Sequence, residues 1–135
     1  MKLTVRVFAA ASLAIAAALV TTSCSSSTSS TGLTPQQLQG SYSLLSLTAA
    51  PNPTLTPPAA TGTLTLTLTR YNVSLNILGT PQLDSGTYTV NGSTFTQTSE
   101  ATGFQYSGTA AVSGDTLTVD VTTPGGQILN TWQKQ

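Results

Sequence analysis

The sequence predicts an all-β fold, a small eight-stranded antiparallel up-and-down barrel preceded by a short N-terminal helical turn. Three observations indicate it. Apolar residues recur at every second position through most of residues 41–133, which is the period of a strand with one buried face. Turn-forming Gly, Pro, Asn, Asp and Ser residues separate the alternating segments. All connections but one are short, so neighbouring strands are expected to pair and close without a free edge. A β-sandwich, the alternative, would need longer links between its sheets.

The first 23 residues are predicted to be a signal peptide. Lys2 and Arg6 precede a largely apolar run over residues 7–20, and the small polar residues 21–23 follow it. A positive start, an apolar segment and a small-residue exit are typical of export signals. The apolar run is also shorter than the about 20 residues that a membrane-spanning helix needs.

Cys24 is the only cysteine of the chain and directly follows this signal. The stretch "LVTTSC" resembles the lipobox of bacterial lipoproteins, although Thr21 stands where that pattern prefers leucine. The resemblance implies that Cys24 is acylated and becomes the mature N-terminus, with the lipid bilayer as its partner. It also implies export to the bacterial cell envelope, with Ser25 favouring the outer membrane. Ordinary cleavage near Ser23, which would leave Cys24 a free thiol, is the alternative.

Residues 24–33 are predicted to form a disordered tether, because serine, threonine and glycine dominate them and bury little apolar surface. The domain that follows, residues 34–135, opens with a helical turn. Thr34 is placed to cap it, Pro35 suits its first position, and Gln37 completes a capping box. Leu38 is expected to pack against Leu33, and the turn to buttress one end of the barrel.

The central strands show the alternation most clearly. Leu64, Leu66 and Leu68 are expected to form one buried face between exposed threonines. From Tyr71 onward the apolar residues lie on odd positions, so a tight corner or a bulge is predicted within residues 69–72. The eight predicted strands are Ser41–Thr48, Thr63–Thr69, Tyr71–Ile77, Gly86–Val90, Ser93–Thr98, Phe104–Ser113, Thr116–Thr122 and Gln127–Gln133.

The one long connection, Ala49–Gly62, contains four prolines and is therefore not predicted to be a strand. Two interpretations remain open for it. The segment either folds over one end of the barrel as a lid or is a solvated connector.

The composition excludes several classes of function. Only 6% of the residues are charged, and beyond the signal two cations stand against four carboxylates, a net charge of −2. Such a surface offers no positive field for phosphates, so nucleic-acid binding is not expected. Because histidine is absent and cysteine occurs once, His-based nucleophile pairs and zinc cages are excluded. Asp84 and Asp115 are expected in turns and Asp120 on an outward face, so neither an enzyme, a metal site nor a cofactor is predicted.

Four segments, "LQGSYSLLSL", "DSGTYTVNGSTFT", "VSGDTLTVDV" and "NTWQKQ", together resemble bacterial lipocalin-like domains. The resemblance implies an eight-stranded meander barrel with a long first loop at an open mouth. Lipocalins carry a Gly-X-Trp motif in their first strand, and Gly40-Ser41-Tyr42 stands in its place here. The family often packs a basic residue of the last strand across that aromatic ring, and Lys134 is the nearest candidate.

The resemblance and the apolar inner faces lead to two hypotheses of function. In the first, the barrel of an envelope lipoprotein binds a small apolar ligand; the small residues Gly108 and Ala110 leave room for it beside Tyr106. In the second, the barrel is filled by side chains and the lipoprotein has a structural or interaction role. Trp132 is expected to plug the barrel, and no polar cluster is predicted inside it. The residues predicted to bind a ligand are Tyr42, Tyr71, Tyr88, Phe104 and Tyr106.

Overall fold

A computed structural model describes residues 32–135. The predicted signal peptide, Cys24 and nearly all of the predicted tether lie outside the described residues. The elements are α1 (Pro35–Leu38), β1 (Gly40–Ala49), β2 (Ala60–Leu66), β3 (Arg70–Ile77), β4 (Thr80–Asn91), β5 (Thr94–Ser99), β6 (Gln105–Ser113), β7 (Thr116–Thr123) and β8 (Gly126–Lys134).

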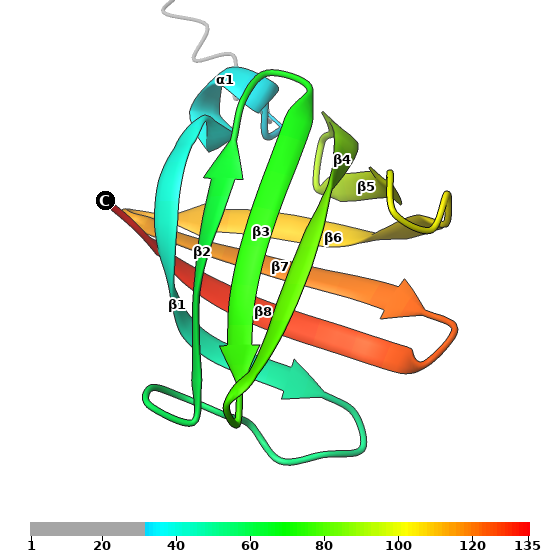
Figure 1. The fold of residues 1–135 in the computed structure, drawn as a ribbon. Coiled ribbons are helices and arrows are strands. Elements are labelled where there is room, and N and C mark those ends of the chain that lie inside the picture. Colours follow the sequence, from blue (N-terminus) through cyan, green and yellow to red (C-terminus); the bar gives the residue numbers. More distant parts are fainter. Residues whose placement is uncertain (1–31) are drawn as a thin grey trace, which may run out of the picture.

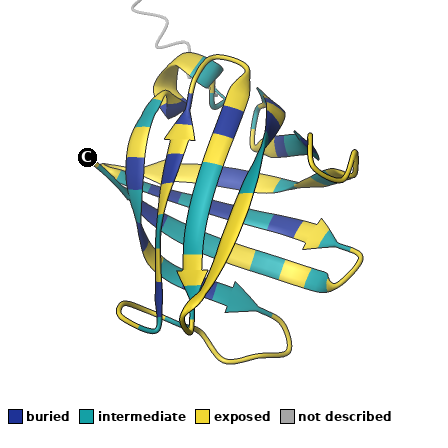
Figure 2. Ribbon diagram, viewed as in Figure 1, coloured by how far each residue is buried: buried dark blue, intermediate teal, exposed yellow. Residues whose placement is uncertain are grey.

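The predicted barrel is confirmed. Each strand pairs antiparallel with the next, and β8 pairs with β1, so the sheet closes in sequence order (Figure 1). Between Leu44 and Ser46 the register of β1 against β8 shifts by a bulge, which adds the local bend that closing a small barrel requires. Figure 2 shows buried and exposed residues alternating along the strands, as a sheet with one inner face demands.

The β2–β3 hairpin explains the change of phase in the threonine-leucine repeat. Leu64 and Leu66 are buried as predicted, and Tyr71 continues the buried face on β3. Leu68, however, is 46% exposed, so its predicted burial is wrong. Strand β2 ends at Leu66, and the backbone N–H of Thr67 donates to the carbonyl of Arg70 (2.9 Å) across the turn. The predicted tight corner is therefore this turn, and Leu68 sits on its tip.

Strand β4 starts six residues earlier than the sequence predicted. The turn is confined to Leu78 and Gly79, which both have positive φ (51° and 85°), the pattern of a type I′ hairpin. Pro81 is accommodated near the start of the strand, where a missing N–H is tolerated. Asp84 thus belongs to a strand rather than to a turn, in phase with the buried Tyr88. Its side chain consequently lies on the inner face.

Helix α1 covers one end of the barrel (Figure 1). Thr34 and Gln37 form the predicted capping box, and Leu38 is fully buried in the core. The hydroxyl of Tyr42 donates to the carbonyl of Leu38 (2.7 Å) and so ties the helix to β1. Lys134 of β8 lies over the Tyr42 ring, with Nζ 5.8 Å from the ring centroid. A basic residue of the last strand therefore packs across the aromatic ring of the Gly-X-aromatic segment.

The connections divide the barrel into two ends. The closed end carries α1, the β2–β3, β4–β5 and β6–β7 turns, and Gln135. The open end carries the other four connections.

The proline-rich connection, residues 50–59, leaves from the open end but does not fold over it. Leu55 pairs with Leu47 of β1 through two backbone hydrogen bonds of 2.8 and 2.9 Å. Nearly all other residues of the segment are exposed. Of the two interpretations, the solvated connector agrees with the structure.

Candidate ligand-binding cavity

Side chains do not fill the barrel. A cavity of about 500 Å³ opens between the walls toward the open end, a volume within the range of small-molecule sites. Most of its lining is apolar, with Val73, Leu75, Val119, Val121 and Ile128 on the walls. The hypothesis of a barrel filled by side chains therefore disagrees with the structure.

Three of the five residues predicted to bind a ligand line this cavity: Tyr71, Phe104 and Tyr106. Tyr71 is buried and Tyr106 is half-buried, both on inner faces. Phe104 lies just before β6 and is 58% exposed, so its ring stands at the rim of the cavity rather than inside it. Trp132, expected to be a plug, also lines the cavity and is buried.

The other two, Tyr42 and Tyr88, belong to the core near the closed end and do not line the cavity. The Tyr88 ring stacks on Phe95 with centroids 5.5 Å apart, and its hydroxyl donates to the carbonyl of Thr67 (2.6 Å). Burial raises the pKa of both hydroxyls. The sequence placed these tyrosines on the correct face but could not give their height along the barrel, which depends on strand stagger.

A polar cluster lies on the inner wall formed by β3, β4 and β5, where the sequence predicted none. Asp84 accepts hydrogen bonds from the Tyr71 hydroxyl (2.7 Å), the Ser99 hydroxyl (2.6 Å) and the backbone N–H of Ser85 (2.9 Å). Burial, and then the hydrogen bond to Asp84, raises the pKa of Tyr71 well above its usual value. Asp84 itself lines the cavity.

Two further polar side chains extend this wall toward β6. Gln97 and Tyr106 are paired residues of β5 and β6, and both line the cavity. On the opposite wall Asn130 of β8 also lines it, and its Oδ1 is buried without a hydrogen-bond partner. The alternation along the strands could have predicted that Asp84 and Asn130 face inward, because residues i and i+2 of a strand share a face. Asp84 stands two residues before Gly86, and Asn130 two residues before Trp132.

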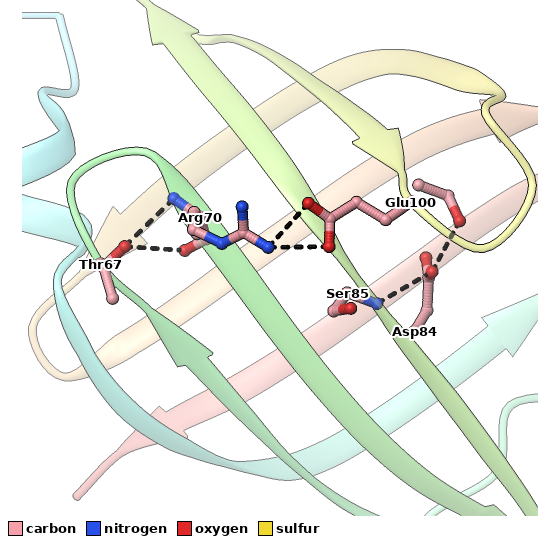
Figure 3. A network of polar contacts seen from close by, with 6 residues as sticks. Thr67, Arg70, Asp84, Ser85 and Glu100 are labelled. Carbon is pink, nitrogen blue, oxygen red and sulfur yellow. Dashed lines mark hydrogen bonds and ion pairs between the residues drawn. The ribbon is translucent and has the colours of Figure 1, made fainter.

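Four charged residues outside the cavity, Arg70, Glu100, Asp120 and Lys134, have polar partners of their own. Arg70 Nη2 lies 2.7 Å from both carboxylate oxygens of Glu100, and Figure 3 shows this pair apart from Asp84. Both side chains are about half exposed, so the pair adds little to stability. Asp120 faces outward, as predicted, and accepts from the amide of Gln127 (2.7 and 2.9 Å). The remaining cation of the described chain, Lys134, lies at the closed end.

Two structural features are absent from residues 32–135. No group of three or more His, Cys, Asp or Glu side chains is arranged to hold a metal ion. Within the same residues, no helix has the length and apolar character to cross a membrane.

Comparison with known proteins supports the architecture. No family model matches the chain, and neither does any curated protein. Among solved structures, the chain is similar to a de novo designed fluorescence-activating β-barrel. The TM-score is 0.52 at 18% sequence identity, and the match covers 75% of this chain and 96% of the designed one. At this identity the likeness concerns the fold alone: an antiparallel β-barrel of this size.

Proposed function

We propose that this protein is a non-enzymatic, lipocalin-like lipoprotein of the bacterial envelope that binds a small, largely apolar ligand in its barrel. The cavity of about 500 Å³ is the observation that carries the proposal, since its open end gives a ligand a way in. The contact of Lys134 with Tyr42 supports the lipocalin-like assignment, because that family often packs a basic residue at this place. The likeness to the designed fluorescence-activating barrel supports the barrel fold on which the proposal depends.

Filling the cavity is expected to weaken binding. Val73 of β3 lines the cavity, whereas the preceding Asn72 is exposed on the outer face. Val73→Trp should therefore reduce the affinity for decanol at least about tenfold, corresponding to about 1.4 kcal/mol, by occupying the space of the ligand. Asn72→Trp should leave it unchanged. Isothermal titration calorimetry of the two variants and the parent measures the difference, after circular dichroism has shown that each is folded.

Equal affinities for the two tryptophan variants would argue against the cavity as the binding site. A parent protein that binds neither decanol nor any co-purifying small molecule in native mass spectrometry would favour a structural or interaction role instead.

The membrane anchor has its own test. Cys24→Ala is expected to abolish incorporation of a radiolabelled fatty acid and to move the protein from the membrane fraction to the soluble fraction. Each buried CH₂ of an acyl chain contributes about 0.8 kcal/mol to the free energy of membrane binding. Loss of the acyl chains should therefore release the protein from the membrane. Ser23→Ala keeps a small residue before Cys24 and should preserve both labelling and attachment. Continued membrane attachment of Cys24→Ala would contradict the anchor.

A further inference from the structure

We propose that the cavity selects amphiphiles that carry a cationic group, an amine on an apolar body, and that Asp84 is the residue that recognises the cation. The inference rests on the proposed function and names its ligand class. Asp84 is a cavity-lining carboxylate, held in the wall by hydrogen bonds from Tyr71, Ser99 and Ser85.

The hydrogen bonds of Asp84 suit a charged carboxylate. Its three partners, two hydroxyls and one backbone N–H, can all donate, and together they reach both carboxyl oxygens. An ionised carboxylate accepts at both oxygens. Asp84 is also the one acidic or basic side chain among the described residues that line the cavity.

No protein cation neutralises this charge within residues 32–135. Arg70 is engaged by Glu100, and Lys134 lies at the closed end with Nζ 3.4 Å from the carbonyl of Gln37. A carboxylate that is partly withdrawn from water and without a counter-charge favours a cation brought by the ligand and repels an anion. The cavity thus discriminates by sign of charge.

The remaining lining brings no second charge. Asn130 lines the opposite wall as a neutral amide, and its Oδ1 is buried. An ammonium group offers three donors, whereas a carboxylate offers none. The side chains of Val119, Val121 and Trp132, which also line the cavity, give an apolar surface for the body of the ligand.

Three probes with one apolar body and different head groups test the inference: decylamine, decanol and decanoate, at neutral pH and below the concentrations at which they form micelles. Trp132, the only tryptophan of the chain, lines the cavity and reports binding through its fluorescence. Decylamine is expected to bind at least about tenfold more tightly than decanoate, with decanol between them, because an opposite charge at contact distance is attracted and a like charge repelled.

The variant Asp84→Asn keeps the shape of the side chain and removes its charge. The preference for decylamine over decanoate should fall to about threefold or less in this variant, since the ionic part of the selectivity is gone. Asp120→Asn removes an equal charge from the outer face of the barrel. This variant should keep the order of affinities that the parent protein shows for the three probes. The circular dichroism spectrum shows whether both variants are folded. The order of affinities of the three probes for the parent protein tests the inference without any variant.

The outcomes separate the inference from the proposed function. Binding of all three probes with equal affinity, or tightest binding of decanoate, would overturn the selection of cations while leaving a ligand-binding barrel. An unchanged preference in a folded Asp84→Asn would overturn the role of Asp84. If none of the probes changes the Trp132 signal or releases heat, the proposed function fails and the inference with it.

Discussion

Replacing Leu117 with alanine is expected to lower the free energy of unfolding by about 3–4 kcal/mol. Leu117 of β7 is 1% exposed and belongs to the core cluster, so the truncation removes buried methyl groups and leaves a void. Its neighbours on the paired strands, Val112 and Trp132, are held by backbone ladders and cannot move in to fill it. Urea unfolding followed by circular dichroism measures the change.

The same substitution at Leu83 is the matched control. Leu83 lies on the outer face of β4 and is 76% exposed, so Leu83→Ala should change the stability by no more than about 0.5 kcal/mol. Comparable losses at Leu117 and Leu83 would mean that the inner and outer faces of the barrel have been assigned incorrectly.

Gly108→Ala is expected to cost about 2–3 kcal/mol, the second large effect. A Cβ at this position would overlap the carbonyl oxygen of Asp120 on the paired strand β7. The Cβ is fixed to the backbone of β6 and the oxygen belongs to the backbone of β7, so relief of the overlap requires a shift of the β6–β7 ladder. Urea unfolding again gives the measurement.

Thr109→Ala provides the control for this prediction, since Thr109 is exposed on the outer face of the same strand. Gly86→Ala offers an independent repeat, because a Cβ there would overlap the carbonyl oxygen of Thr98. A Gly108→Ala variant as stable as Thr109→Ala would show that β6 can relax at this point.

The prediction that Gly108 leaves room for a ligand is therefore revised. Its missing side chain lets β6 and β7 approach closely, as small closed barrels need at sharp bends. The space for a ligand arises elsewhere in the barrel, where medium-sized side chains line the cavity: Val73 on β3, and Val119 and Val121 on β7. Glycine in a strand marks either a cavity or a close approach, and the sequence does not distinguish them.

Much of the fold could be predicted because local and global preferences agree. Period-two alternation, glycine-containing turns and short connections all favour antiparallel neighbours, and the eight strands appear in that order. The helical turn was also predictable, since the Thr34–Gln37 capping box is encoded within four residues. Local chemistry is sufficient for elements of this kind.

The site was less predictable because it depends on long-range geometry. Asp84 is surrounded by Pro81, Ser85 and Gly86, a composition typical of turns, yet pairing with β3 extends β4 through it. The stagger of the strands then places Asp84 and Tyr71 at the cavity and Tyr88 near the closed end. No periodicity encodes that stagger.

The two ends of the described domain, residues 32–135, have a practical consequence. Leu33 pairs with Gly92, and the N–H of Gln135 donates to the carbonyl of Ser41 (2.9 Å), so both lie on the side of the molecule that α1 covers. A biosensor made from this domain can be immobilised, or fused to a reporter, through either terminus while its entrance faces the sample. The placement of both ends on one side also suits circular permutation, with new termini cut in the exposed proline segment.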